Sequence, residues 1–493
     1  MRRSSAILTK RVIGARFSST KSSASVVVGG AEQSPVKPPY YRKTLPPHKP
    51  MNMLQEEYPN IGDKTGHGPR LYDYYNIAEQ VRALPTATER INFVNPFERE
   101  WNAVEKTWRR QWQPQLMAPR KAWNVPSVPK YFDSLDFYKY ITKSRVVSDP
   151  QEFDKIYAGL VLPTNKFEER LLESLESMEN ANSVDLSESE RMNRFLRTVL
   201  DDAMVSLAHN VERFQDLRLA HTTRCESFWV RSGFLSMYDK KELGSDEIER
   251  RIRFANRFIG DDRRKLGELS FVLRDQIAAQ LRSKKAPKQL FDISSEDALK
   301  PIFDEDVDVS EDVIYSPKVF NMWPDTDILW QCPGYESDSN ETHKFGHLAI
   351  KEVSELNNLL DYWKVDGEEF EQVKRDAMTS TAVSSLFSWL NAQAHCLGYT
   401  QYTDLDRPLV SQLILSDGND FFFAVAQLNT IAINIDVDGF VNNKSNVCYV
   451  DGPHPLFIEE TGADAAEGEA VEEPSVKVNQ HVLTRILQML RRE

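Results

Sequence analysis

Residues 382–434 read AVSSLFSWLNAQAHCLGYTQYTDLDRPLVSQLILSDGNDFFFAVAQLNTIAIN, and nowhere else in the chain are apolar residues so dense with so few interruptions. The first part predicts a helix, because five apolar residues recur at spacings of four and three along one stripe: Val383, Phe387, Leu390, Ala394 and Leu397. Gly398 follows where a glycine would end such a helix.

The second part of this segment predicts an antiparallel strand pair. Residues 409–415 and 421–435 are mostly β-branched, aromatic or leucine, and Asp417-Gly418-Asn419 between them is a hairpin signal. The first strand carries apolar residues on both faces, with Leu409, Leu413 and Leu415 on one and Val410 and Ile414 on the other. We therefore expect both faces of the sheet to be covered, and expect Gln412, Gln427 and Asn429 to find hydrogen-bond partners inside.

The first thirty residues have a different composition from the rest of the chain. Six Lys or Arg residues lie among Ser, Ala, Ile, Leu and Val, and no acidic residue occurs before Glu32. This composition predicts a mitochondrial transit peptide, with processing near Phe17 to Ser19; a basic tail without a targeting role is the alternative. Removal of residues 1–16 takes away five positive charges and changes the formal net charge from −13 to −18.

With 493 residues, 41% of them hydrophobic and 27% charged, the chain can form several structural units. We predict an α+β fold with a helical N-terminal part, an extended arm, and a C-terminal mixed α/β domain built around the antiparallel strand pair. The predicted units are a transit peptide (1–18), a proline-rich extended arm (19–98), a basic aromatic stretch with a helical domain (99–225), a basic helical region with an acidic linker (226–330), and the C-terminal α/β domain (331–493).

Further elements follow from local patterns. Helical periodicity extends from Pro150 to His221, with a polar break at 182–189, and an amphipathic helix is expected at 478–490. The run Phe228-Trp229-Val230 predicts a strand. Apolar runs are too short for a membrane span.

Two windows are candidates for RNA contact. Residues 99–145 contain ten Lys or Arg against four acidic residues, interleaved with four tryptophans. Such windows can bind phosphates and stack on unpaired bases. The alternative is that the tryptophans are core anchors and the charges form a solvated face. The candidate RNA-binding residues in this window are Arg109, Arg110, Arg120 and Lys121.

The second window, residues 250–288, contains twelve Lys or Arg against four acidic residues. Release of counterions favours binding of such a window to rRNA. A solvated helix with ion pairs four residues apart is the alternative, but two such pairs leave most of the cations without a partner. The candidate RNA-binding residues here are Arg263, Arg264 and Lys265.

No motif for catalysis or for a cofactor occurs in the sequence. Nucleotide-binding glycine loops, the hydrolase nucleophile elbow and the zincin motif are all missing. The best metal candidate is Cys332 with His343 and His347, whose histidines could share a helix face, but a fourth ligand for a closed zinc site is lacking. The four cysteines are far apart and are expected to be reduced. We therefore predict no enzyme activity, no small-molecule substrate, no cofactor and no metal.

Three C-terminal segments resemble a known family. They are SSLFSWLNAQAHCLGY (384–399), RPLVSQLILSDGNDFFFAVAQLNTIAIN (407–434) and NVCYVDGPHPLFIEE (446–460), and a weaker similarity occurs at 226–231. These segments closely resemble the mitochondrial ribosomal proteins of the programmed cell death protein nine family. The resemblance covers about the last quarter of the chain and carries no catalytic residues.

The resemblance implies a place in the mitochondrial ribosome, in its large subunit, although the family was first assigned to the small one. The expected partners are mitochondrial large-subunit rRNA and other mitochondrial ribosomal proteins, in the matrix. A mitochondrial scaffold protein and an uncharacterised matrix enzyme are the alternative functions; a scaffold protein would not follow ribosomes through a gradient.

Overall fold

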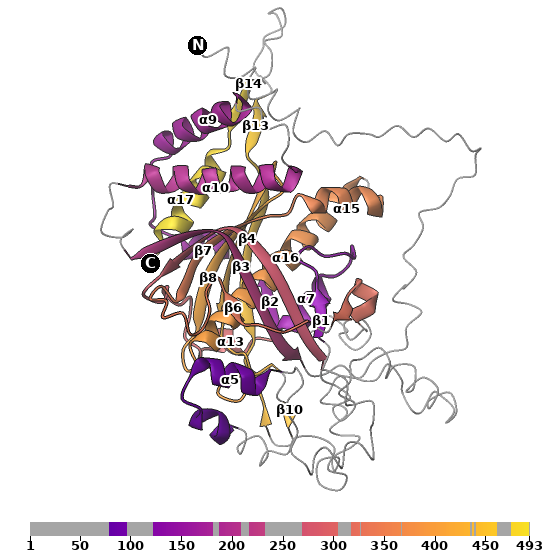
Figure 1. Ribbon diagram of the computed structural model, residues 1–493. Coiled ribbons are helices and arrows are strands. Elements are labelled where there is room, and N and C mark those ends of the chain that lie inside the picture. Colours follow the sequence, from indigo (N-terminus) through magenta and orange to yellow (C-terminus); the bar gives the residue numbers. More distant parts are fainter. Residues whose placement is uncertain are drawn as a thin grey trace, which may run out of the picture.

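The protein is described here by a computed structural model that covers residues 78–95, 122–180, 187–208, 216–231, 269–303, 317–325, 327–365, 367–433, 436–437, 440–460 and 475–492 (Figure 1). The predicted transit peptide, most of the predicted arm and the acidic run of the predicted linker, residues 304–308, lie outside these residues. The last part of the predicted arm is helical, at 78–83 and in α5 (Ala87–Val94).

The other helices in the described part of the chain are α7 (Leu135–Thr142), α8 (Pro150–Ile156), α9 (Asn165–Asn180), α10 (Glu188–Ser206), α13 (Glu296–Leu299), the 3-10 helix η3 (Pro317–Phe320), α15 (Glu355–Trp363), α16 (Glu368–Cys396) and α17 (Gln480–Arg491). Local capping explains where several of them begin. The Ser187 hydroxyl accepts the N–H of Glu190, and the Glu190 carboxylate accepts the N–H of Ser187, so the two residues cap the start of α10 reciprocally.

Ten of the described strands form one mixed sheet. They are β1 (Ala122–Val125), β2 (Ser144–Val147), β3 (Leu217–Arg231), β4 (Leu269–Ser283), β5 (Trp323–Asp325), β6 (Cys332–Pro333), β7 (Phe345–Glu352), β8 (Leu409–Ser416), β9 (Asp420–Leu428) and β12 (Asn446–Pro455). Two small sheets pair β10 (Asp436–Val437) with β11 (Phe440–Val441), and β13 (Phe457–Glu460) with β14 (Ser475–Val478).

The main path of the large sheet runs β2-β12-β9-β8-β7-β4-β1-β5, with β3 paired to β4 and β6. The pairs β2–β12, β7–β8 and β1–β4 are parallel, and the others are antiparallel. Helices and a mixed sheet together confirm the α+β class. The sheet takes strands from three of the predicted units, and the division into units stays a prediction.

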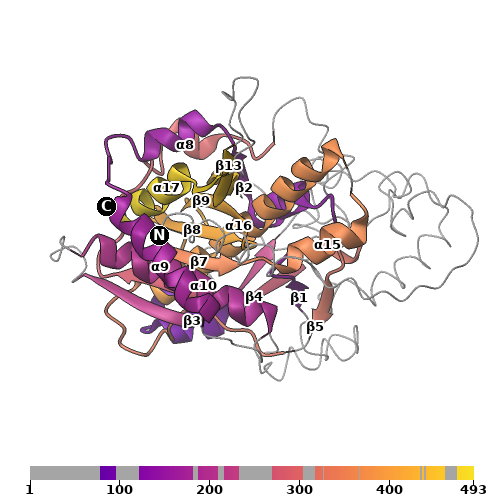
Figure 2. The same cartoon turned by 90° about the horizontal axis from the view of Figure 1, so that it is seen from above.

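The antiparallel pair β8–β9 confirms the prediction for residues 409–428. Apolar side chains of β8 alternate between two cores, as expected. Leu409, Leu413 and Leu415 join one core, and Val410 and Ile414 join the other. Helices α8, α9, α10 and α17 contribute to the second core, so they cover one face of the sheet (Figures 1 and 2).

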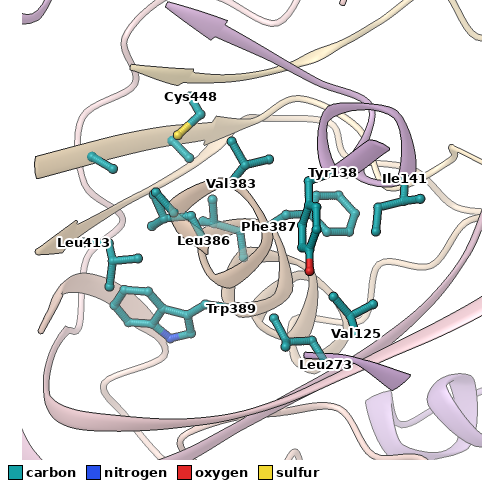
Figure 3. Close-up of a cluster of buried hydrophobic side chains, with 14 of the residues drawn as sticks. Val125, Tyr138, Ile141, Leu273, Val383, Leu386, Phe387, Trp389, Leu413 and Cys448 are labelled. Atoms are coloured by element: carbon teal, nitrogen blue, oxygen red, sulfur yellow. The ribbon is translucent and has the colours of Figure 1, made fainter. Parts of the chain in front are cut away.

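The opposite face is covered mainly by α16 and α7. Val383, Leu386 and Phe387 of α16 lie among side chains from several strands and from α7 (Figure 3). The helix ends as predicted: Leu397 is its C-cap, and Gly398 follows with a φ of +98°, a conformation that favours glycine. Gly346 of β7 is also required, because a Cβ there would lie 2.4 Å from the Trp389 ring.

The three buried amides that the sequence leaves without partners all find them. Gln412 donates to the carbonyls of His347 and Met489 and accepts from the Tyr157 hydroxyl. Gln427 accepts the N–H of Leu290, and Asn429 donates to the Ser445 carbonyl. The bonds of Gln412 and Gln427 connect β8 and β9 to segments far away in the sequence.

Three secondary-structure predictions are wrong in part. The second strand of the hairpin, expected at 421–435, ends at Leu428 in β9. The helical pattern expected up to His221 ends at Ser206 in α10, and residues 217–221 belong to β3. In the region 226–330, which was predicted to be helical, residues 269–283 form the strand β4. Phe271, Leu273 and Val272 of β4 are all buried because the strand is covered on both faces, so no clear helical or strand period marks it.

Candidate functional site

The seven candidate RNA-binding residues from the sequence all lie outside the described residues. They are Arg109, Arg110, Arg120, Lys121, Arg263, Arg264 and Lys265. The last part of each basic window is described, at 122–145 and 269–288, and shows which contacts the other cations make.

The described end of the first window stabilises the fold. Lys130 pairs with Glu355, and Lys139 lies 3.2 Å from the Asp136 carboxylate and over the Phe303 ring. Trp123 is completely buried in the core beneath α16. In this part of the window, the interpretation as core anchors and local ion pairs is therefore the better one.

The strand β4 of the second window holds its cations in ion pairs. Arg274 pairs with the fully buried Glu226 of β3 at 3.3 Å. Arg282 is buried and pairs with Glu341, at 3.2 Å. The Arg282 guanidinium is therefore not available to a nucleic acid, and the charge of Arg274 is already paired within the sheet.

The residues that follow β4 are different. Lys284, Lys285 and Lys288 are exposed, and Lys284 is paired only loosely with Asp216, at 3.4 Å. Because Ser283 of β4 is the partner of Phe345 in β7, the exposed Lys344 lies at the same end of the ladder.

Two arginines extend this surface. Arg218 of β3 lies opposite Arg282 in the sheet, and the guanidinium of Arg407 packs over the Phe345 ring at 5.8 Å. We call the surface formed by Arg218, Lys284, Lys285, Lys288, Lys344 and Arg407 the basic rim. Its exposed cations outnumber the acidic residues beside them, which are Asp216, Glu341 and Asp406.

Glu341 connects Arg218 of the basic rim to the buried Arg282. Its carboxylate accepts hydrogen bonds from Arg218 and Arg282 and from the N–H of His343. Burial alone would raise the pKa of Glu341, but the hydrogen bonds from His343 and the charges of Arg282 and Arg218 lower it to about 2. Glu341 therefore stays ionised and keeps the two guanidinium groups in place.

The most buried ion pair links the sheet to α16. The Lys351 ammonium donates to Asp275 at 2.8 Å, to the Ser385 hydroxyl at 3.0 Å and to the Ser127 carbonyl at 2.8 Å. The Ser385 hydroxyl also donates to Asp275, at 2.7 Å. Since both charged side chains are at most 3% exposed, this cluster is closed to a substrate and serves to join elements.

The structure does not place the two histidines of the metal candidate on a shared helix face. His343 precedes β7 and His347 lies within it, so the two do not share a helix face. His347 is buried, with its Nε2 3.1 Å from the Leu490 carbonyl oxygen. Residues 345–352, FGHLAIKE, form a strand, in which successive side chains point to opposite faces of the sheet. Both faces of this strand are covered.

A second cluster of titratable groups, which sequence reasoning missed, lies where β12 meets α17. The Asp451 carboxylate is 2.7 Å from Nε2 of His454 and 3.5 Å from Nε2 of His481. Arg485 of α17 donates to the same carboxylate, at 3.1 Å from its Nε. Burial alone would raise the pKa of Asp451, but the hydrogen bonds with both histidines and the charge of Arg485 hold it well below its usual range.

Exposed aromatic and aliphatic side chains mark another part of the surface. Trp323, Ile328 and Trp330 are each at least half exposed, while Leu329 between them is buried against α5 and β1. Large apolar side chains left in solvent are typical of surfaces that become buried in an assembly.

Among the described residues, no helix is long and apolar enough to cross a membrane. In comparison with known proteins, the family model described as mitochondrial 28S ribosomal protein S30 (PDCD9) matches residues 16–493. The match covers nearly the whole chain and agrees with the resemblance of its C-terminal segments. The name of this family refers to the small subunit, whereas the resemblance implied the large one. This chain belongs to the PDCD9 family of mitochondrial ribosomal proteins.

Proposed function

We propose that the chain is a structural component of the mitochondrial ribosome that supports mitochondrial translation through contacts with rRNA and with other ribosomal proteins. The observation that supports this most strongly is the basic rim, a group of exposed cations on a chain with a net charge of −13. A local group of exposed cations attracts phosphates, because binding of the phosphates releases their counterions.

The arrangement of the basic rim supports this part of the proposal. Lys284 and Lys344 lie at the ends of two paired strands, so their positions are fixed by the sheet. Lysine presents a compact charge on a flexible stem, which suits the backbone of a folded RNA and requires no particular base. The proposal includes Arg109, Arg110, Arg120, Lys121, Arg263, Arg264 and Lys265 as further RNA contacts.

The aromatic surface at Trp323 and Trp330 suits a different partner. Both side chains are at least half exposed. Two arginines near Trp330, Arg224 of β3 and Arg274 of β4, are paired with Glu226. Such a surface favours contact with another protein, where tryptophan is a frequent anchor.

We place the chain in the large subunit. This placement follows the resemblance of the segments between residues 384 and 460 and differs from the family name, which refers to the small subunit. After mitochondrial subunits are separated at low magnesium, the chain should be recovered with large-subunit rRNA. Recovery with small-subunit rRNA would contradict the large-subunit placement while the ribosomal role stands.

The experiment that tests the rRNA contact reverses three charges of the basic rim. In the variant Lys284→Glu/Lys285→Glu/Lys288→Glu, rRNA binding by the purified full chain should weaken. The slope of log K against log salt should become shallower by about 2 to 3, since each lost phosphate contact removes about 0.7 to 0.9 of slope.

A matched control carries the same change in charge on another face. In the variant Lys155→Glu/Lys166→Glu/Arg170→Glu, three exposed cations of α8 and α9 are reversed. This control should retain the steep salt dependence of the original chain. Equal losses in both triple variants would mean that only net charge matters, and the basic rim would then have no specific role.

A further inference from the structure

We propose that Asp451, His454 and His481 form a binding site for a divalent transition metal of the zinc class, at the junction of β12 and α17. The site is distinct from the basic rim, and it does not depend on the ribosomal role. One aspartate oxygen and one ring nitrogen from each histidine all lie within 4.8 Å of one another.

The two imidazoles already converge on one carboxylate. Nε2 of His454 lies 2.7 Å from Oδ1 of Asp451, and Nε2 of His481 lies 3.5 Å from Oδ2. The rings meet edge to face, with their centroids 4.6 Å apart. A zinc ion needs ligand atoms at about 2.0 to 2.2 Å, so small rotations of the side chains bring all three into its coordination sphere.

The surrounding residues hold the carboxylate in position. Arg485 donates from Nε and from its terminal nitrogen to Oδ2 of Asp451, which leaves Oδ1 directed toward His454. The guanidinium also lies over the rings of Phe153 and Tyr157 and bonds Asp154. A ligand fixed from behind in this way loses less freedom when a metal binds.

The local charge is compatible with a dication. Asp451 and Asp154 supply two negative charges and Arg485 supplies one positive charge. With neutral imidazoles, the cluster therefore has a net charge of −1 before a metal binds. When the metal takes the Nε2 lone pair of each ring, the ring proton resides on Nδ1, so no net proton loss is needed.

The donor set selects the class of metal. Two imidazole nitrogens and one carboxylate suit Zn²⁺ and its neighbours, and they are a poor set for Mg²⁺ or Ca²⁺, which require oxygen ligands. Asp451 is buried, whereas His454 is half-buried and His481 exposed, so a metal can enter from solvent. Three protein ligands leave a further position for water or for a group from a neighbouring molecule.

A bound metal would connect distant parts of the chain. Asp451 and His454 belong to β12, and His481 lies in the first turn of α17. Because a metal that binds only the folded state stabilises it, zinc should raise the unfolding temperature by strengthening this junction.

The test is a zinc titration of the purified full chain after removal of metal by EDTA, with a chromophoric zinc indicator as competitor. We expect one zinc ion per chain from this site, and a higher Tm that EDTA reverses. In His454→Ala and in His481→Gln, zinc affinity should fall by about tenfold or more, a loss at least as large as those seen when supporting residues around a metal are removed.

The matched control is His343→Ala, since His343 also lies beside a carboxylate, Glu341, but has no second histidine there. It should bind zinc like the original chain. The Tm of each variant in EDTA reports folding, and His481→Gln keeps a polar side chain at an exposed position so that it should fold. The proposal is overturned if the original chain binds no zinc, or if both ligand variants bind it as tightly as the original chain.

Discussion

At the scale of single residues, the buried ammonium of Lys351 shows how this fold accommodates a charge inside the core. The Lys351 ammonium has three partners, one each from β4, α16 and the segment after β1. Burial of an ion pair is costly unless its geometry satisfies the remaining donors, and here all three donors of the ammonium are satisfied. The pair therefore fixes how α16 sits on the sheet.

This arrangement predicts an asymmetry between single and double variants. Lys351→Met leaves the Asp275 charge buried without its cation and should cost about 3 to 5 kcal/mol in the free energy of unfolding. Lys351→Met/Asp275→Leu removes both charges and should cost less than the single change. Urea unfolding of the original chain, of Lys351→Met, of Asp275→Leu and of the double variant measures the difference. A double variant that loses the sum of both single effects would contradict the ion pair.

Glu341 predicts a dependence of stability on pH. Its pKa is lowered in the folded state to about 2, from 4.5, so its contribution is fully present above about pH 4.5 and is lost as the pH falls toward 2. Glu341→Gln should therefore lose less stability than the original chain between about pH 5 and pH 3. The urea midpoints of Glu341→Gln and of the original chain across this pH range test the prediction. The exposed Glu169→Gln on α9 serves as the control and should follow the original chain.

At the scale of elements, the strand β8 is the centre of the molecule. It is paired on both sides, by β7 and β9, and its side chains enter both cores. Ile414 of β8 is completely buried in the core beneath α8, α9, α10 and α17.

A charge at this position should not be tolerated. Ile414→Asp buries a carboxylate without a partner and should cost about 3 to 5 kcal/mol, enough to make the protein insoluble or unable to assemble. Val161→Asp places the same carboxylate on a side chain that is 93% exposed and should be nearly neutral. Solubility and thermal unfolding of the two variants test this prediction. Normal folding of Ile414→Asp would mean that β8 is not central.

The elements that could be predicted from the sequence are those whose residues carry their own periodicity. The stripe from Val383 to Leu397, the alternation of β8 and the hairpin at Asp417 each involve neighbours in sequence, as does the amphipathic helix α17. The strand β4 has no such period, because both of its faces are buried and its cations pair with Glu226 of β3 and with Glu341 before β7.

The candidate sites depend on contacts that no local pattern contains. Lys284 and Lys344 are sixty residues apart, and only the register of β4 with β7 puts them at one end of the sheet. Asp451 and His454 are close in sequence, but His481 joins them through the packing of α17 on the sheet. The D-x-x-H spacing was a signal that could have been noticed, although it occurs often by chance.

At the scale of the whole molecule, the structure combines a closed core with distinct outer surfaces. The helices on both faces of the sheet leave the basic rim at one strand end, and exposed tryptophans occur on another part of the surface. The chain belongs to a mitochondrial ribosomal protein family, and we propose that rRNA contacts the first surface and another protein contacts the second.

The most direct measurement is sedimentation of the chain from mitochondrial lysates on a sucrose gradient, with rRNA and the chain quantified in every fraction. The account predicts that the chain travels with large-subunit rRNA, and that it moves to the monosome fraction when the subunits join. The triple variant of Lys284, Lys285 and Lys288 to Glu should shift toward the top of the gradient while its Tm stays unchanged, because exposed changes cost under about 0.5 kcal/mol each. A chain found only at the top of the gradient, separate from both subunits, would contradict the structural role in the ribosome.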